Sequence, residues 1–213
     1  MSRELRVHGF VNDKCYIAGI TKDTLVHSVR AAYLVLDAID ETLLRQGLPR
    51  LSRLVELANL SSMVGNILAN EIVKASSSLF RRAGAHKYQD LRATDPRTAE
   101  DIEVKVALES NKPKGHLPKE GCYLTFRYVL AGCSGEYKRG DRQDVVWIWE
   151  IRLGRLSKEH FNLSNTTGDS GKTAVVNASG LGELRVLYFD DAFSPYASPE
   201  AYRNRAEANI TIA

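Results

Sequence analysis

Two carboxylates and a lysine stand close together near the middle of the chain. Asp90 and Leu91 are followed by eleven residues and then by Glu103, Val104 and Lys105. A hard cation such as Mg²⁺ prefers carboxylate oxygens, and it can both activate water and stabilise charge on phosphate oxygens. We expect Asp90, Glu103 and the Val104 carbonyl to bind Mg²⁺, and Lys105 to position or help deprotonate a water. This set suits the hydrolysis of a phosphodiester bond.

The segment that contains this lysine has the periodicity of a β-strand. Ile102, Val104 and Val106 alternate with Glu103 and Lys105. Successive side chains of a strand point to opposite faces, so the two charged residues share one face, roughly 6.5–7 Å apart along the strand. The apolar residues then enter the core, and a rigid strand holds the polar pair in place.

Other carboxylates compete for these roles. Asp95 precedes Pro96 and can simply start a turn. Asp101 is only two residues from Glu103, which is too close in sequence for the carboxylate that would bind the metal together with Glu103. A second acidic-x-lysine triplet at 136–138 lies in a glycine-flanked segment without apolar alternation, so we reject it. Asp90 is the favoured first carboxylate, with Asp95 and Asp101 as rivals.

The arrangement of Asp90, Glu103 and Lys105 resembles the PD-(D/E)xK nuclease superfamily, especially the type II restriction endonucleases. The resemblance covers about residues 65–155: a helix, the loop with the acidic residue, the strand with the triplet and further strands. The proline of the family motif is Gln89 here. The resemblance implies an α/β (α+β) fold with a restriction-endonuclease-like core, in which helices flank a central mixed β-sheet. It also implies Mg²⁺-dependent cleavage of double-stranded DNA at a specific sequence.

Glu71 is a candidate fourth catalytic residue. It falls on the apolar side of a helix expected at 61–80, and burying an unpaired charge there is costly. The carboxylate therefore needs a partner, either a basic side chain or a metal. In the nucleases that this chain resembles, a helix before the motif often contributes a glutamate to the metal site. A structural hydrogen bond is the alternative.

Basic residues flank the proposed site in sequence, and phosphate binding needs cations on one surface. The loop 111–116 directly follows the catalytic strand, and the stretch 138–143 has arginines and a glutamine suited to reading guanine and adenine edges. An ordinary solvated hairpin tip is the alternative for the second stretch, and a surface histidine is the alternative for the first. The candidate DNA contacts are Lys112, Lys114, His116, Lys138, Arg139, Arg142 and Lys172.

The segment 168–173 (GDSGKT) partly matches a phosphate-binding loop. The motif needs a glycine where this chain has Thr166, and a helix should follow, whereas 173–176 has the composition of an extended segment. We therefore expect no nucleotide cofactor. Lys172 in this polar loop is kept only as a possible DNA contact.

Helices are expected in the first part of the chain and strands in the second. Residues 22–46 carry an apolar stripe that Val26 and Tyr33 broaden, which is either a dimer surface or a core-facing side. Helices first and a mostly antiparallel sheet with mixed edges afterwards suggest an α/β or α+β sandwich. We predict one nuclease domain over 1–213, with a helical part at 1–60 and a catalytic core at 61–213. The expected helices are 22–46, 51–59 and 61–80, and the expected strands are 102–106, 122–131, 144–153 and 183–189.

Composition places few limits on this function. Hydrophobic residues make up 44% and charged residues 26%, which is ordinary for a globular protein, and the net charge is only +3. Any DNA-binding surface must therefore concentrate its basic residues locally. We expect no signal peptide and no membrane partner, three reduced cysteines without a zinc pattern, and a prokaryotic cytoplasmic location.

Double-stranded DNA is the expected partner, and the two-fold symmetry of a palindromic site suggests a homodimer. One rival reading is a DNA-repair or resolvase-type nuclease with the same core. Another rival, from a different functional class, is a non-catalytic DNA-binding module in which the pair Glu103 and Lys105 is only structural.

Overall fold

The computed structural model describes residues 3–11, 16–84, 88–164 and 173–208. The first long helix is α1 (Lys22–Arg45), and the Thr21 hydroxyl caps its start by accepting a hydrogen bond from the N–H of Thr24 (3.0 Å). Gly47 follows its end with a φ of 72°, a conformation that glycine adopts readily. The helix predicted over 22–46 is confirmed.

The helix predicted over 51–59 is wrong. The structure divides this segment into α2 (Leu51–Leu54) and the first turn of α3 (Leu57–Ala75). Val55 between them is extended, with φ −122° and ψ 154°. The first N–H of α2 donates to the Asp40 carboxylate of α1 (2.9 Å), so a contact distant in sequence sets where this short helix begins.

The third helix was predicted over 61–80, and its limits also differ. It starts at Leu57 and ends at Ala75. Ser77 and Ser78 follow with φ values of 48° and 70°, which no right-handed helix can include. The chain then turns directly into a short strand.

A six-stranded mixed sheet forms the centre of the fold, in the order β11-β8-β7-β5-β4-β3. Its strands are β3 (Phe80–Arg82), β4 (Leu91–Ala93), β5 (Ile102–Leu108), β7 (Gly121–Ala131), β8 (Val145–Leu156) and β11 (Arg185–Phe189). All neighbouring strands in this sheet are antiparallel except β5 and β7, which are parallel. The parallel pair is therefore central, and the expectation of mixed edges is wrong. Two parallel neighbours need a connection of about a dozen residues, and residues 109–120 supply it.

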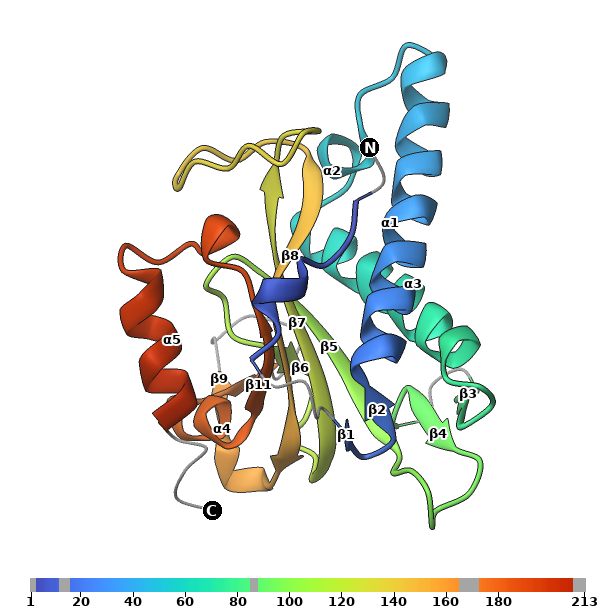
Figure 1. Cartoon of the computed structure of the whole chain (residues 1–213), viewed down its shortest axis with the longest axis vertical. Coiled ribbons are helices and arrows are strands. Elements are labelled where there is room, and N and C mark those ends of the chain that lie inside the picture. The colour runs from blue at the N-terminus through green and yellow to red at the C-terminus, as the bar shows by residue number, and fades with distance from the viewer. Residues whose placement is uncertain (1–2, 12–15, 85–87, 165–172, 209–213) are drawn as a thin grey trace.

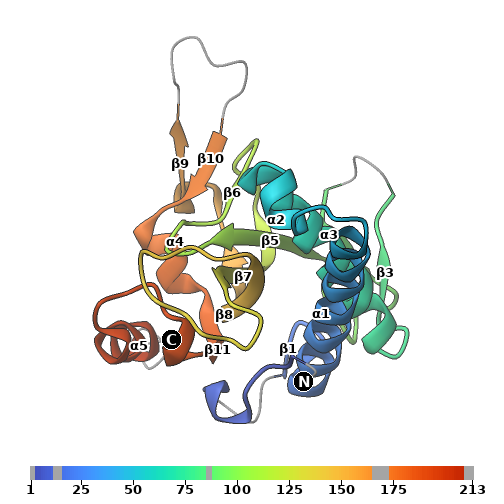
Figure 2. The ribbon, with the colours of Figure 1, turned by 90° about the horizontal axis from the view of Figure 1, so that it is seen from above.

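Helices cover both faces of this sheet (Figures 1 and 2). On one face, α1 and α3 pack on a core that includes Ile102, Val104 and Leu124. The opposite face carries Glu103 and Lys105, because alternate residues of β5 point there. Segments that follow β8, other than the sheet strand β11, cover that second face. A central mixed sheet flanked by helices was predicted, and this coarse α+β architecture is confirmed.

Smaller elements lie around the central sheet. A second sheet has three strands in the order β6-β10-β9, and Figure 2 shows β9 and β10 projecting from the body. The remaining elements are β1 (Tyr16–Ile17), β2 (Ile20–Thr21), β6 (Lys114–Gly115), β9 (Phe161–Ser164), β10 (Thr173–Val176), α4 (Ala178–Glu183) and α5 (Pro199–Ala208). Three short 3₁₀ turns complete the described elements, at Val7–Gly9, Lys158–His160 and Asp191–Phe193.

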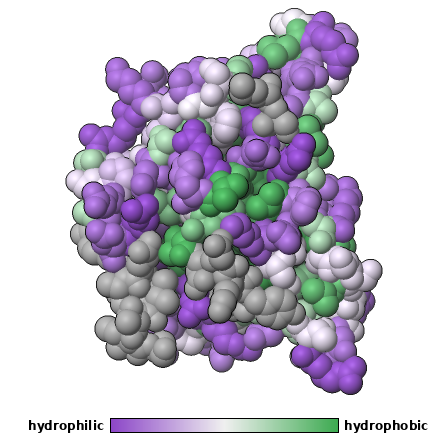
Figure 3. All heavy atoms as spheres, viewed as in Figure 1, coloured by the Kyte–Doolittle hydropathy of each residue, from purple (hydrophilic) through white to green (hydrophobic). Residues whose placement is uncertain are grey.

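The apolar stripe of α1 faces the core of its own chain from Leu25 to Leu36, whereas Ile39 and Leu43 near the end of the helix are only partly buried. Val29, Tyr33 and Leu36 are buried against the central sheet. Of the two readings of this stripe, internal packing is the one that the structure shows, and the homodimer stays a prediction. Hydrophilic side chains dominate the face shown in Figure 3, with apolar side chains in small patches. Among the described helices, none is both long enough and apolar enough to cross a membrane.

Candidate functional site

The predicted catalytic residues lie at a place where β5 changes from an inner strand to an edge strand. The neighbouring strand β4 pairs with β5 at one position only, Leu91 with Ile102. From Glu103 onward, β5 is bonded on one side to β7 and has a free edge on the other. A groove of about 970 Å³ runs along this edge, and Asp90, Glu103 and Lys105 all line it.

Asp90 and Glu103 are held together by two reciprocal hydrogen bonds. The N–H of Val104 donates to Oδ2 of Asp90 (3.0 Å), and the N–H of Gln89 donates to Oε2 of Glu103 (2.9 Å). Each carboxylate therefore binds the backbone next to the other one. The loop that precedes β4 thus brings Asp90 to the charged face of β5.

Gln89 stands where the resembling family has proline, and its geometry excludes proline here. Its φ is 66°, whereas proline is restricted to about −65°. Its N–H is also the donor to Glu103, and proline has no N–H. The Gln89 side chain adds a hydrogen bond from Nε2 to the carbonyl of Asp101 (3.0 Å). This chain therefore shapes the turn before Asp90 without a proline.

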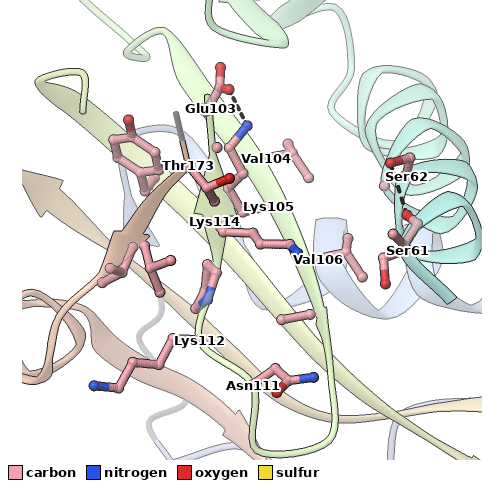
Figure 4. Close-up of a pocket in the computed structure, with 18 of the residues that line it drawn as sticks. Ser61, Ser62, Glu103, Val104, Lys105, Val106, Asn111, Lys112, Lys114 and Thr173 are labelled. Carbon is pink, nitrogen blue, oxygen red and sulfur yellow. Dashed lines mark hydrogen bonds and ion pairs between the residues drawn. The ribbon is translucent and has the colours of Figure 1, made fainter. Parts of the chain in front are cut away.

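Basic side chains neutralise both carboxylates in part. The Lys105 ammonium forms an ion pair with Oε1 of Glu103, and Figure 4 shows it reaching toward that carboxylate. The Arg82 guanidinium of β3 lies 3.9 Å from Oδ1 of Asp90 and donates to Oδ1 of Asn66 (3.3 Å). Oδ1 of Asp90 is therefore still available to a further partner.

The donor set fits a cation that completes its shell with water and substrate. Among the described residues, no group of three or more histidines, cysteines and carboxylates could hold a metal. Mg²⁺ rarely needs such a group, because it is usually bound by one or two carboxylates, several waters and substrate phosphates. The N–H and C=O of one residue point to the same side of a strand. The carbonyl of Val104 therefore faces the free edge beside Asp90, where it can serve as the third oxygen.

The rival carboxylates are engaged elsewhere. Asp95 pairs with Arg97 (2.7 Å) at an exposed turn, and this guanidinium holds the pKa of the Asp95 carboxyl below its usual value. Asp101 pairs with Arg92 (3.0 Å) and accepts a hydrogen bond from the N–H of Ala93 (2.8 Å). Neither carboxylate lines the groove. Asp90 is the one that the fold brings beside Glu103.

Glu71 does not join this group. Its side chain is buried on α3 and pairs with Lys74 of the next turn (2.6 Å). Other residues of α3, including Ser61, Ser62 and Asn66, line the groove, whereas Glu71 does not. Of the two partners considered for this carboxylate, the structure shows a lysine.

The predicted DNA contacts fall into two sets. Lys112, Lys114, His116 and Arg142 line the groove, and Arg142 also forms an ion pair with Glu109 (2.9 Å). Lys138 and Arg139 lie in the exposed connection between β7 and β8, outside the residues that line the groove. Lys172 and the segment 168–172 lie outside the described residues.

Sequence reasoning missed two tyrosines, Tyr88 and Tyr123, that line the groove. The Tyr88 hydroxyl donates to the Glu120 carbonyl (3.0 Å) and lies 3.3 Å from the Tyr123 hydroxyl. The Lys119 ammonium lies 4.4 Å from the centre of the Tyr88 ring. Burial raises the pKa of Tyr88, and the charge of Glu103 raises it further. The closeness of Tyr88 to Asp90 in sequence is the one signal that could have indicated it.

Comparison with known proteins does not identify this site. The chain matches no protein-family model, no curated protein and no solved structure. Any assignment of function therefore rests on the residues of the groove and on their chemistry.

Proposed function

We propose that this chain is a Mg²⁺-dependent, site-specific deoxyribonuclease that acts on double-stranded DNA as a type II restriction endonuclease does. The observation that supports this most is the convergence of Asp90, Glu103 and Lys105 on one groove. Two carboxylates beside a lysine, on the free edge of a rigid strand, form a set suited to phosphodiester hydrolysis. The element order that the resemblance implies, helix, acidic loop, strand and further strands, also occurs here.

Each residue has a role in this proposal. Asp90, Glu103 and the Val104 carbonyl would hold Mg²⁺, which supplies an activated water and neutralises charge on the phosphate oxygens. Lys105, which pairs with Glu103 in this structure, would orient the attacking water or an oxygen of the phosphate. Lys112 and Lys114 of the groove wall, which form no ion pair with another described residue, would attract the DNA backbone.

Cleavage of DNA by the purified protein tests this proposal. The protein is incubated with plasmid DNA of mixed sequence and Mg²⁺, with EDTA as the blank, and the cut ends are sequenced. We expect discrete fragments whose ends share one sequence. Lys105→Ala should lower the single-turnover rate by about 100-fold or more, whereas Lys158→Ala, at an exposed lysine outside the groove, should not. Full metal-dependent cleavage by Lys105→Ala would contradict the assignment.

One observation favours a second candidate, a DNA-binding module without catalysis. The ion pair between Glu103 and Lys105 and the bond from Val104 to Asp90 already satisfy much of the charge in the site. A purely structural group would look similar. Binding of duplex DNA without cleavage of any DNA in the presence of Mg²⁺ or Mn²⁺ would support this candidate instead.

A further inference from the structure

The free edge of β5 offers a second binding point beside the Asp90 and Glu103 pair. The N–H of Val104 points to that edge, because it donates to Asp90. The N–H of Glu109 points the opposite way, to the carbonyl of Tyr128 in β7. Backbone direction alternates along a strand. The N–H of Val106 therefore points to the free edge and into the groove, two residues beyond Val104.

Val106 is the one residue of this edge whose backbone is left without a partner in the described part of the chain. The N–H of Val104 is used by Asp90, and the carbonyl of Leu108 accepts from the N–H of Asn111 (3.0 Å). No side chain or turn that the structure describes binds Val106. One open residue is too short for pairing with another strand, but it suits a single oxygen acceptor.

The surroundings of Val106 indicate the charge of that acceptor. Lys114 of β6 lines the same groove, and Figure 4 shows its side chain extending across the pocket in the direction of Val106, whereas Lys112 points away. No hydrogen bond or ion pair to another described residue holds the Lys114 ammonium. Ser61 and Ser62 of α3 face the groove from the other side and bring no charge.

Helix α3 lies close to β5 beside Val106. A Cβ at Gly65 of α3 would lie 3.3 Å from Cγ2 of Val106, so the small residue lets the helix approach the strand. On the other side, a Cβ at Gly115 of β6 would lie 3.5 Å from Cε of Lys105. The two glycines thus place α3 and β6 close on either side of β5, with the free edge between them.

We propose that the Val106 N–H and the Lys114 ammonium form a second phosphate subsite, which binds the phosphate next to the one at Asp90 and Glu103 in a nucleic acid strand. Residues two apart on β5 are roughly 6.5–7 Å apart, so the subsite lies one strand repeat from the proposed catalytic pair. A neutral N–H and a mobile ammonium contact backbone oxygens and read no base. The Val106 carbonyl is left for water or for the ammonium. This inference rests on the proposed function.

Salt-dependent binding tests the role of Lys114. Binding of a fluorescent mixed-sequence DNA duplex is measured in EDTA, where no cleavage occurs, over a range of salt concentrations. The logarithm of the binding constant falls with the logarithm of salt by about 0.9 for each phosphate contact. We expect Lys114→Ala to reduce that slope by about 0.9, while Lys158→Ala leaves it unchanged. An unchanged slope for Lys114→Ala would overturn the subsite.

A proline variant tests the backbone donor. Proline is tolerated on an edge strand where its N–H would face away from the sheet. Val106→Pro should bind the duplex about tenfold more weakly than Val106→Ala, with the same salt slope, because the lost donor is neutral. Val106→Ala keeps the N–H, so it measures how much the Val106 side chain alone contributes to the affinity for the duplex. Equal binding by the two variants would contradict the subsite.

Amide hydrogen exchange provides a second test of the Val106 donor if the proline variant does not fold. In the parent protein, the Val106 amide should exchange more slowly after the duplex binds, and an unchanged rate would contradict the subsite. The outcomes separate the two proposals. Normal cleavage with an unchanged slope for Lys114→Ala overturns the subsite alone. The expected slopes without any Mg²⁺-dependent cleavage overturn the proposed function alone, and a parent that binds no duplex overturns both.

Discussion

The backbone N–H of Gln89 donates to the carboxylate of Glu103 (2.9 Å), so a turn residue orients a proposed metal ligand fourteen positions later in the chain. Gln89 achieves this with a φ of 66°, which proline cannot adopt. The left-handed turn at Gln89 is thus part of how this chain holds Glu103 beside Asp90.

Replacing Gln89 by proline should destabilise the folded protein. Gln89→Pro removes the donor to Glu103 and forces a different φ, which should cost about 3 kcal/mol or more of unfolding free energy. Urea denaturation measures this loss. Gln89→Gly is the matched control, because glycine keeps the N–H and accepts a positive φ. A proline variant as stable as the glycine variant would contradict the described turn.

The strands with a clear pattern could be predicted from the sequence. Those expected at 102–106, 122–131 and 144–153 occur as β5, β7 and β8, with limits that differ by up to three residues. Apolar alternation or a continuous apolar run identifies such strands. The three-residue strands β3 and β4 are too short for any periodicity.

The candidate site was partly predictable for the same reason. The shared face of Glu103 and Lys105 follows from strand geometry, and the structure places both in the groove. The left-handed turn at Gln89, the pairing of Glu71 with Lys74 and the free edge at Val106 depend on contacts between distant segments. Local sequence does not carry that information.

A buried charge cluster on the second face of the sheet should be essential for stability. Glu150 is 1% exposed and pairs with both Arg127 and Arg152. Glu150→Gln should cost about 3–5 kcal/mol, because it leaves two buried guanidinium groups without their counter-charge. The exposed pair of Arg155 and Glu100 provides the control, since Glu100→Gln should cost less than about 1 kcal/mol. Similar losses in denaturation experiments would contradict the burial of the cluster.

Tyr33 should stabilise the fold below the ordinary pKa of tyrosine. Its hydroxyl accepts a hydrogen bond from the N–H of Ile148 (2.8 Å), so Tyr33→Phe should cost about 1–3 kcal/mol. Burial raises the pKa of Tyr33 above its usual value. The unfolded chain therefore loses this proton first as pH rises above about 10, and the stabilisation decreases by up to about 1.4 kcal/mol per pH unit.

Urea denaturation of the parent and of Tyr33→Phe at neutral and alkaline pH tests whether the stabilisation by Tyr33 decreases as the pH rises. The free energy difference between the parent and Tyr33→Phe should be constant below the ordinary tyrosine pKa and should shrink above it. A difference that grows with pH would mean that Tyr33 ionises more easily in the folded state than in the unfolded chain.

The two described cysteines should react differently with alkylating agents. Burial raises the pKa of the Cys122 thiol to about 12, whereas Cys133 is exposed. The thiolate is the reactive form, so iodoacetamide at neutral pH should label Cys133 in the folded protein and Cys122 only after unfolding. Mass spectrometry of the separate peptides distinguishes both from Cys15. Rapid labelling of Cys122 in the native protein would contradict its place in the core.

Paired variants of the rival aspartates test the proposed metal site most directly. Single-turnover cleavage of DNA with Mg²⁺ is compared for the parent, Asp90→Asn and Asp95→Asn. Asp90→Asn should reduce the rate by more than about 100-fold, because it removes a carboxylate that would hold the cation. Asp95→Asn should cleave like the parent, because Asp95 lies outside the groove. Full Mg²⁺-dependent cleavage by Asp90→Asn would contradict the account of this site.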